Sequence, residues 1–105
     1  MKGFNEYQHE AFEFARYRTV FYPFMALGEE CGEAQALIAK SMRKHGNLSG
    51  VDKHKFAKEL GDVLWNVAAC ATEMGLSLAD IAEDNLDKLK ERRANGTIVE
   101  RTSDS

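Results

Sequence analysis

The chain has 105 residues, of which 44% are hydrophobic and 30% are charged, as expected for one soluble globular domain. Its formal net charge of −3 argues against stable binding of duplex nucleic acid, because such binding usually needs a basic face. No apolar run approaches the roughly 18 residues of a membrane span, and the N-terminus does not resemble a signal peptide. Cys31 and Cys70 lack metal-motif spacing and are interpreted as small buried hydrophobic residues. We therefore expect a cytoplasmic protein that does not contact membranes.

Two helices are predicted in the first half of the chain from apolar spacing and from residues that start or stop helices. The first covers about residues 5–18, and Asn5 is its expected N-cap. The second covers about residues 23–44, because Pro23 suits a first turn and Gly46 is a natural stop. Its apolar side chains form one stripe at helical spacing, made of Leu27, Cys31, Ala34, Ile38 and Met42.

Two more helices are predicted in the second half. The third covers about residues 52–74, and Asp52 is its expected cap. The fourth begins at Ser77, which together with Asp80 resembles a capping box, and it ends near residues 95–96. The apolar stripe of the third helix consists of Phe56, Leu60, Leu64, Val67, Ala71 and Met74.

The predicted fold class is all-α. Short connections between amphipathic helices are typical of antiparallel neighbours, so we expect a four-helix bundle-like domain over residues 1–96. Residues 97–105 are polar, and we expect a mobile tail there. A domain of this size buries a modest fraction of its surface, and oligomerisation is a common remedy. We therefore expect at least a dimer.

Two acidic pairs share one spacing, Glu30-x-x-Glu33 on the second helix and Glu59-x-x-Asp62 on the third. Residues three apart project from one side of a helix, so antiparallel helices would bring both pairs into one region. At 100° per residue, Glu30 and Glu33 lie about 60° and about 120° from the apolar stripe, on the same flank. Glu59 lies about 100° from the stripe of its own helix, whereas Asp62 lies about 160° away and fits least well.

Four converging carboxylates would repel one another strongly without a counter-charge. A hard divalent cation removes that repulsion, and an all-oxygen ligand set suits Mg²⁺ or Mn²⁺. The spacing therefore predicts a metal site. The alternative interpretation is that both acidic pairs simply belong to solvated helix faces, and the spacing alone leaves both interpretations open.

The fourth helix carries an amide and two cations, Asn85, Lys88 and Arg92, on the side opposite most of its acidic residues. Asn85 falls about 20° from the centre of the apolar stripe, so this side of the helix is expected to face inward or toward the seam edge. Inward cations beside a carboxylate cluster suggest phosphate binding. A purely structural hydrogen-bond network is the alternative.

Two residues that follow the second acidic pair are weaker candidates. Trp65 lies on the back of its helix, about 140° from the apolar stripe, which favours burial against another helix or a second subunit. Asn66 lies on the carboxylate flank, one turn beyond Asp62, and is a candidate for binding the edge of a nucleobase.

The acidic motifs resemble a known family. LGEECGE at residues 27–33, followed by ELGDVLW at residues 59–65, is similar to the MazG-like all-α nucleoside triphosphate pyrophosphohydrolases, whose pattern is EExxE and then ExxD on the next helix. The run from Asn85 to Arg92 also resembles the downstream element of that family. The resemblance covers nearly the whole chain.

The resemblance implies Mg²⁺-dependent hydrolysis of (deoxy)nucleoside triphosphates to the monophosphate and pyrophosphate, with Mn²⁺ as a possible substitute. It also implies a homodimer or homotetramer with sites at or near subunit contacts, and we hypothesise a role in cleaning dNTP pools. Glu29 would orient or deprotonate the attacking water, Lys88 and Arg92 would hold phosphate oxygens, and Asn85 would bind near the sugar or phosphates. The implied metal ligands are Glu30, Glu33, Glu59 and Asp62.

Three other functions are considered. A non-catalytic helical interaction module would oligomerise through its apolar seams and be indifferent to Mg²⁺. A di-iron carboxylate bundle typically needs two Glu-x-x-His pairs on different helices, whereas the sequence has one, Glu6-x-x-His9. A phosphoribosyl-ATP pyrophosphohydrolase of histidine synthesis fits the pattern less well than the MazG-like group, but the sequence does not exclude it.

Overall fold

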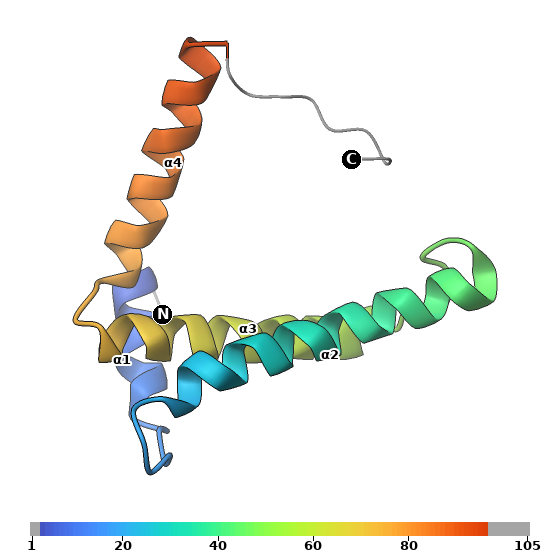
Figure 1. The fold of residues 1–105 in the computed structure, drawn as a ribbon, viewed down its shortest axis with the longest axis horizontal. Helices are drawn as coiled ribbons and strands as arrows, with labels where there is room; N and C mark the ends of the chain where they lie inside the picture. Colours follow the sequence, from blue (N-terminus) through green and yellow to red (C-terminus); the bar gives the residue numbers. More distant parts are fainter. Residues whose placement is uncertain (1–2, 97–105) are drawn as a thin grey trace.

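The structure, a computed structural model, describes residues 3–96, and that range folds into four α-helices without a strand (Figure 1). The predicted all-α fold class is confirmed. None of the described helices is long and apolar enough to cross a membrane. The tail predicted at residues 97–105 lies outside the described residues. The helices are α1 (Phe4–Phe12), α2 (Tyr22–His45), α3 (Lys53–Glu73) and α4 (Leu78–Ala94).

Helix α1 is shorter than the sequence predicted, because it ends at Phe12 and residues 13–21 connect it to α2. Tertiary contacts of Tyr17 explain the early end. Its hydroxyl donates a hydrogen bond to the carboxylate of Glu73 on α3. Its ring stacks on Tyr22 with centroids 5.7 Å apart and meets Trp65 edge-on at 6.5 Å. These aromatic contacts lie across the molecule, so helical propensity over residues 13–18 does not decide the local structure.

The prediction that Asn5 is the N-cap of its own helix is wrong, because Asn5 helps to cap α4 instead. The N-cap of α1 is Gly3, which has no side chain to offer. The Asn5 Oδ1 atom instead accepts hydrogen bonds from the Ser77 hydroxyl at 2.8 Å and from the Ala79 N–H at 3.0 Å. Ser77 itself caps α4 as predicted, because its hydroxyl oxygen accepts from the Asp80 N–H at 3.2 Å. The N–H groups of Ala79 and Asp80 in the first turn of α4 are therefore satisfied by Asn5 and Ser77, of which Asn5 is distant in sequence.

Gln8 joins α1 to the turn between α3 and α4. Its Oε1 atom accepts from the Leu78 N–H at 2.7 Å, while its Nε2 atom donates to the Leu76 carbonyl at 2.9 Å and to the Thr72 hydroxyl at 3.1 Å. Leu78 is buried, so its N–H needs a partner within the protein. One side chain therefore determines how α4 leaves the rest of the molecule.

Helices α2 and α3 form an antiparallel hairpin that is the centre of the fold (Figure 1). Gly46 ends α2 in the left-handed conformation with φ 70°, and the Asp52 side chain caps α3 by accepting from two backbone N–H groups, as predicted. Small residues at the buried positions let the two helices approach closely. These buried residues are Ala26, Ala34 and Ser41 on α2 and Ala68, Ala69 and Ala71 on α3.

The close alanine contacts leave much larger apolar side chains outside. Leu60 and Leu64, which the stripe of the third helix predicted to be buried, are 49% and 38% exposed. Cys31, also predicted to be buried, is exposed, whereas Cys70 is half-buried. Ala71 of the same stripe is buried, so the stripe is buried at its small residue and exposed at its leucines.

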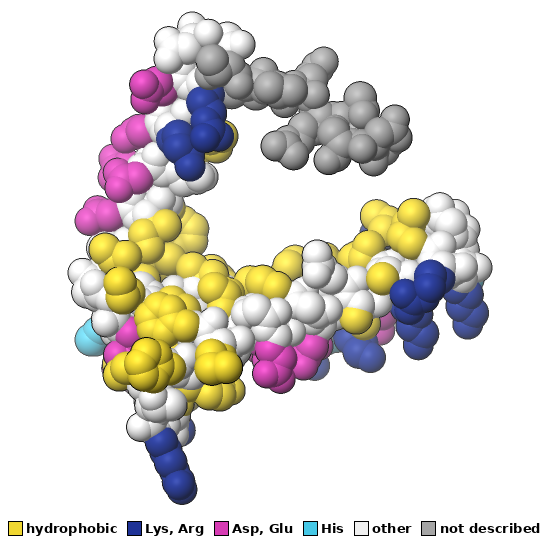
Figure 2. All heavy atoms as spheres, in the orientation of Figure 1, with side chains coloured by type: hydrophobic (Ala, Val, Ile, Leu, Met, Phe, Trp, Pro, Cys, Tyr) yellow, Lys and Arg dark blue, Asp and Glu magenta, His cyan; other side chains and the backbone are white. Residues whose placement is uncertain are grey.

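The bundle interpretation predicts that α4 is an antiparallel neighbour of α3, and the structure shows that it is not. Its first turn packs on α1, and the rest runs away from the hairpin (Figure 1). Figure 2 shows its acidic side chains along one side and its basic side chains on another. Its apolar residues Ile81, Leu86 and Leu89 are 38%, 54% and 41% exposed. One chain by itself therefore does not complete a bundle around α4.

We predict that Gln8→Ala lowers the free energy of unfolding by about 1–3 kcal/mol, because it leaves the buried Leu78 N–H without its partner. Urea denaturation at one fixed protein concentration measures this change. Gln35→Ala is the matched control, because Gln35 is exposed on α2. Equal effects of the two substitutions would contradict a special role for Gln8.

Candidate functional site

Three carboxylates meet where α2 and α3 face each other. Glu30 and Glu33 come from α2, and Glu59 comes from α3. Each offers an oxygen, and these atoms lie within 4.8 Å of one another. Figure 2 shows acidic side chains gathered along the middle of one edge of the hairpin, with Lys and Arg side chains further along. The hairpin therefore brings together three of the four acidic residues that the sequence predicted to converge.

The surroundings of this acidic cluster disfavour full ionisation. Desolvation raises the pKa of Glu30 and of Glu59, and the nearby charge of Glu33 raises both further. The Oε2 atoms of Glu30 and Glu59 are buried and have no hydrogen-bond partner. Buried carboxylate oxygens without partners are costly unless a proton or a cation satisfies them. The donor set, all carboxylate oxygens, fits a hard divalent cation such as Mg²⁺.

Asp62 lies beside the cluster without joining its tight group. Its charge raises the pKa of both Glu30 and Glu59, and its side chain lines a pocket together with Glu30. This offset agrees with the helical angles, which placed Asp62 furthest from the seam. Glu29, the predicted catalytic residue, precedes Glu30 on α2 and is exposed. A carboxylate at that position is open to water next to the cluster.

Asn66 and Trp65 form the wall of a pocket of about 220 Å³ that adjoins the acidic cluster. Its lining residues are Tyr22, Glu30, Asp62, Trp65 and Asn66. Asn66 is only 5% exposed, and its Nδ2 atom donates to the Asp62 carbonyl at 2.9 Å. Its Oδ1 atom has no partner. Trp65 is half-buried, and its indole N–H donates to the Ala11 carbonyl of α1 at 3.0 Å, so the predicted packing against another helix is confirmed.

Asn85, Lys88 and Arg92 lie on α4, and the structure does not bring them to the acidic cluster of the same chain. All three are exposed, so the expectation that Asn85 would be inward-facing is wrong for the single chain. The physical reason is the direction of α4, which leaves the hairpin instead of packing along it (Figure 1). Their contacts with a substrate therefore stay a prediction.

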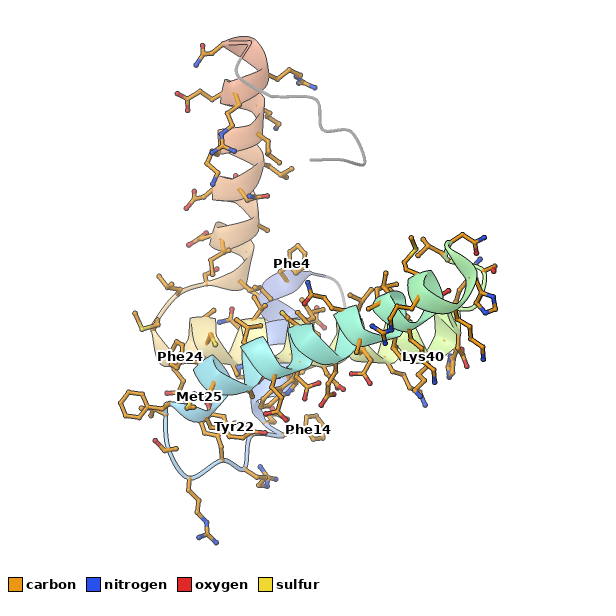
Figure 3. The ribbon with its side chains drawn as sticks, turned by 45° about the vertical axis from the view of Figure 1, so that its right-hand side comes forward. Phe4, Phe14, Tyr22, Phe24, Met25 and Lys40 are labelled. Carbon is orange, nitrogen blue, oxygen red and sulfur yellow. The ribbon has the colours of Figure 1, made fainter. Side chains whose placement is uncertain are left out.

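Sequence reasoning missed Lys55, which lies one helical turn before Glu59. Its positive charge lowers the pKa of Glu59 and so opposes the effect of burial. Lys55 also lines a pocket of about 320 Å³ together with Lys40 and Lys44, toward the closed end of the hairpin. Figure 3 shows Lys40 on this part of α2. The available signal in the sequence was the spacing of Lys55 and Glu59, because residues four apart on a helix are neighbours on its surface.

The comparisons with known proteins agree with this geometry. Residues 24–97 match the family model of the MazG nucleotide pyrophosphohydrolase domain, which is well over half of the chain. The Gene 37 protein of Mycobacterium phage L5 is 35% identical over 78 residues, which are 73% of this chain and 68% of the phage protein. No solved structure matches the chain. The matched range contains the acidic cluster, α4 and all lining residues of the Asn66 pocket except Tyr22.

We predict that the metal-free protein loses stability as the pH rises from about 4.5, the ordinary pKa of a glutamate, toward neutrality. The folded chain holds protons on Glu30 and Glu59 at pH values where the unfolded chain has released them. Their contribution is therefore complete below the unfolded pKa and is lost as the pH rises through the raised folded pKa. Thermal unfolding between pH 4.5 and pH 8 in the presence of a chelator measures this slope.

Two controls separate the cluster from other titrating groups. Glu33→Gln removes a charge that raises both pKa values, so it should flatten the slope. Glu83→Gln changes an exposed carboxylate of α4 and should leave the slope as it is. Mg²⁺ should raise Tm more at pH 7.5 than at pH 5, because protons and metal compete for the same oxygens. A Tm that is insensitive to Mg²⁺ at both pH values would contradict a metal site.

Proposed function

Because the chain belongs to the MazG nucleotide pyrophosphohydrolase family, we propose that it hydrolyses (deoxy)nucleoside triphosphates to the monophosphate and pyrophosphate with Mg²⁺. The observation that carries this proposal is the convergence of three carboxylates with buried oxygens that have no partner. A cation that binds these oxygens would offset the cost of their burial, which supports a metal site. The proposed physiological role is the cleaning of dNTP pools.

In the proposed site, Glu30, Glu33 and Glu59 hold the metal, and Asp62 completes the ligand set from the neighbouring position. Bound Mg²⁺ would offset the charge of the triphosphate and lower the pKa of a coordinated water. Glu29 is exposed beside this group and accepts the proton of the attacking water. Such catalysis consists mostly of positioning and electrostatics, which a rigid helical hairpin supplies well.

The reaction balances with one water. The water oxygen forms a bond to the α-phosphorus, and the anhydride bond between the α- and β-phosphates breaks. The electron pair of that bond leaves with pyrophosphate, and the water proton passes to Glu29. Lys55 lies one turn, about 6 Å, along α3 from Glu59, at the scale of a phosphate chain. Its ammonium group would therefore hold oxygens of the leaving pyrophosphate.

We further propose that the active protein contains at least two copies. The apolar side chains of α4 and the Leu60–Leu64 part of α3 are exposed in one chain and would be covered by a partner. A partner is also needed to bring Asn85, Lys88 and Arg92 to an acidic cluster. In this arrangement Lys88 and Arg92 hold phosphate oxygens, and Asn85 binds near the sugar or phosphates of a substrate on another copy.

We predict Mg²⁺-dependent pyrophosphate release from at least one of the four dNTPs or four NTPs. A chelator should abolish it, and Glu59→Gln should lower kcat/KM by at least about 100-fold, because the metal loses a ligand. Glu83→Gln, on the exposed acidic side of α4, is the matched control and should keep wild-type activity. No release from any nucleotide by folded, metal-loaded protein would contradict the proposal and favour phosphoribosyl-ATP or the non-catalytic module.

We also predict that two inactive variants complement each other. Glu59→Gln damages the metal site, whereas Lys88→Ala damages the phosphate contact that a second copy supplies. Mixed and reassembled copies of the two variants should recover activity, up to about a quarter of the wild-type value for random reassortment. Each variant alone provides the baseline. No recovery in mixed oligomers, or a stable monomer in sedimentation, would contradict a site built from two copies.

A further inference from the structure

The hairpin has two chemically different ends on either side of the acidic cluster. Toward its closed end lie Lys40, Lys44 and Lys55, none of which forms an ion pair with a described carboxylate. Toward its open end lies the pocket with Asn66, Trp65 and Tyr22. A nucleotide also has two chemically different ends, with anionic phosphates at one end and an aromatic base at the other.

We propose that the nucleoside end of the substrate enters the Asn66 pocket and that the Asn66 Oδ1 atom accepts a hydrogen bond from an exocyclic amino group of the base. The substrate class is then a nucleoside triphosphate with an amino-bearing base, cytosine or adenine, over uracil or thymine. This inference rests on the proposed function and adds the direction in which the substrate lies and the group that selects its base.

The orientation follows from charge. Glu30 and Asp62 line the Asn66 pocket, and no basic side chain contributes to its lining. The lysines on the other side of the cluster favour phosphate, and Lys55 is within one turn of Glu59. With the α-phosphate at the acidic cluster, the β- and γ-phosphates extend toward the lysines and the nucleoside extends toward Asn66.

The aromatic residues provide the room and the surface for a base. Tyr22 and Trp65 also line a second pocket of about 570 Å³, to which Arg16 and Arg18 contribute as well. The Trp65 N–H is already bonded to the Ala11 carbonyl, so Trp65 can offer the base only its ring. Stacking of a base on an aromatic ring is favourable for every base and therefore does not select among them.

Selection comes from the Asn66 amide, whose orientation is determined by its own helix. The Nδ2 atom donates to the Asp62 carbonyl, and a flipped amide would place two oxygens against each other. The Oδ1 atom is thus an acceptor, it is buried, and it has no partner. A buried acceptor of this kind needs a donor, and the substrate is the group that can supply one.

An amino group suits this pocket better than a keto oxygen. The Asn66 Oδ1 atom at its wall only accepts hydrogen bonds, and the Nδ2 atom of the same amide already donates to the Asp62 carbonyl. The keto oxygen at C4 of uracil or thymine would face the Oδ1 acceptor and be repelled. The amino group at C4 of cytosine, or at C6 of adenine, presents N–H donors at the same edge of the base.

The test compares substrates that differ only at this edge. CTP, UTP and a CTP analogue that lacks the 4-amino group are hydrolysed by the wild type and by Asn66→Ala. For the wild type we expect kcat/KM for CTP to exceed both others by about 10-fold or more, mainly through KM. For Asn66→Ala we expect the three values to agree within about 2-fold. Asn95→Ala, outside the pocket at the end of α4, is the matched control and should keep the wild-type ratios.

Binding without turnover gives a second readout. Trp65 is the only tryptophan of the chain, so its fluorescence reports occupation of the pocket. Titration with CMP and with UMP in the presence of Mg²⁺ should show tighter binding of CMP to the wild type. The two monophosphates and the amino-free analogue are compared on the wild type alone, so this result does not depend on whether Asn66→Ala folds.

The outcomes separate this inference from the proposed function. Equal kcat/KM for CTP, UTP and the analogue in the wild type would overturn the inference while leaving pyrophosphohydrolysis intact. An equal loss for all three in Asn66→Ala, together with a weaker Mg²⁺-induced Tm shift, would overturn it in favour of a contact with metal-bound water. Absence of hydrolysis with every nucleotide, with no fluorescence change, would overturn both.

Discussion

The mutual repulsion of Glu30, Glu33 and Glu59 is the constraint on which the rest of the structure depends. Alanines buried on α2 and α3 let the two helices approach closely. Each of the three carboxylates then offers an oxygen that lies within 4.8 Å of the other two. Packing therefore imposes an electrostatic cost that a proton or a divalent cation relieves. If the cluster holds a metal as we propose, the stability of the hairpin and its function are coupled through these three carboxylates.

The chain also lacks a complete set of contacts for its apolar surface. Helix α4 is attached through Asn5 and Gln8 of α1 and then runs away from the hairpin, with apolar side chains along it. Many such side chains exposed on one chain are unusual for a protein that acts alone. A second copy would cover them and would bring the α4 cations to an acidic cluster. The attachment by a few hydrogen bonds thus matters for the site as well as for stability.

Along the hairpin, lysines, carboxylates and an aromatic pocket follow one another in that order. This order matches the succession of phosphates, reacting phosphorus and base in a nucleotide. Along α3, Lys55 lies about one turn before Glu59 and Asn66 about two turns after it, a scale close to that of the substrate parts. Because α2 and α3 are antiparallel, Tyr22 near the start of one helix meets Trp65 and Asn66 toward the end of the other. In the proposed function, this order would give the bound nucleotide a direction along the hairpin.

The sequence by itself determined the helices of the hairpin, the Asp52 and Ser77 caps, and the convergence of three acidic residues, because caps and i,i+3 spacing act within a few residues. Asp62 could be expected to lie at the edge for the same reason. Only the tertiary structure decided the end of α1, the role of Asn5, and the course of α4. Asn5 and Ser77 are 72 residues apart, and no local signal shows such a contact. The burial of Asn66 and the exposure of Leu60 likewise depend on which flanks of two helices meet, which side-chain size and packing decide together.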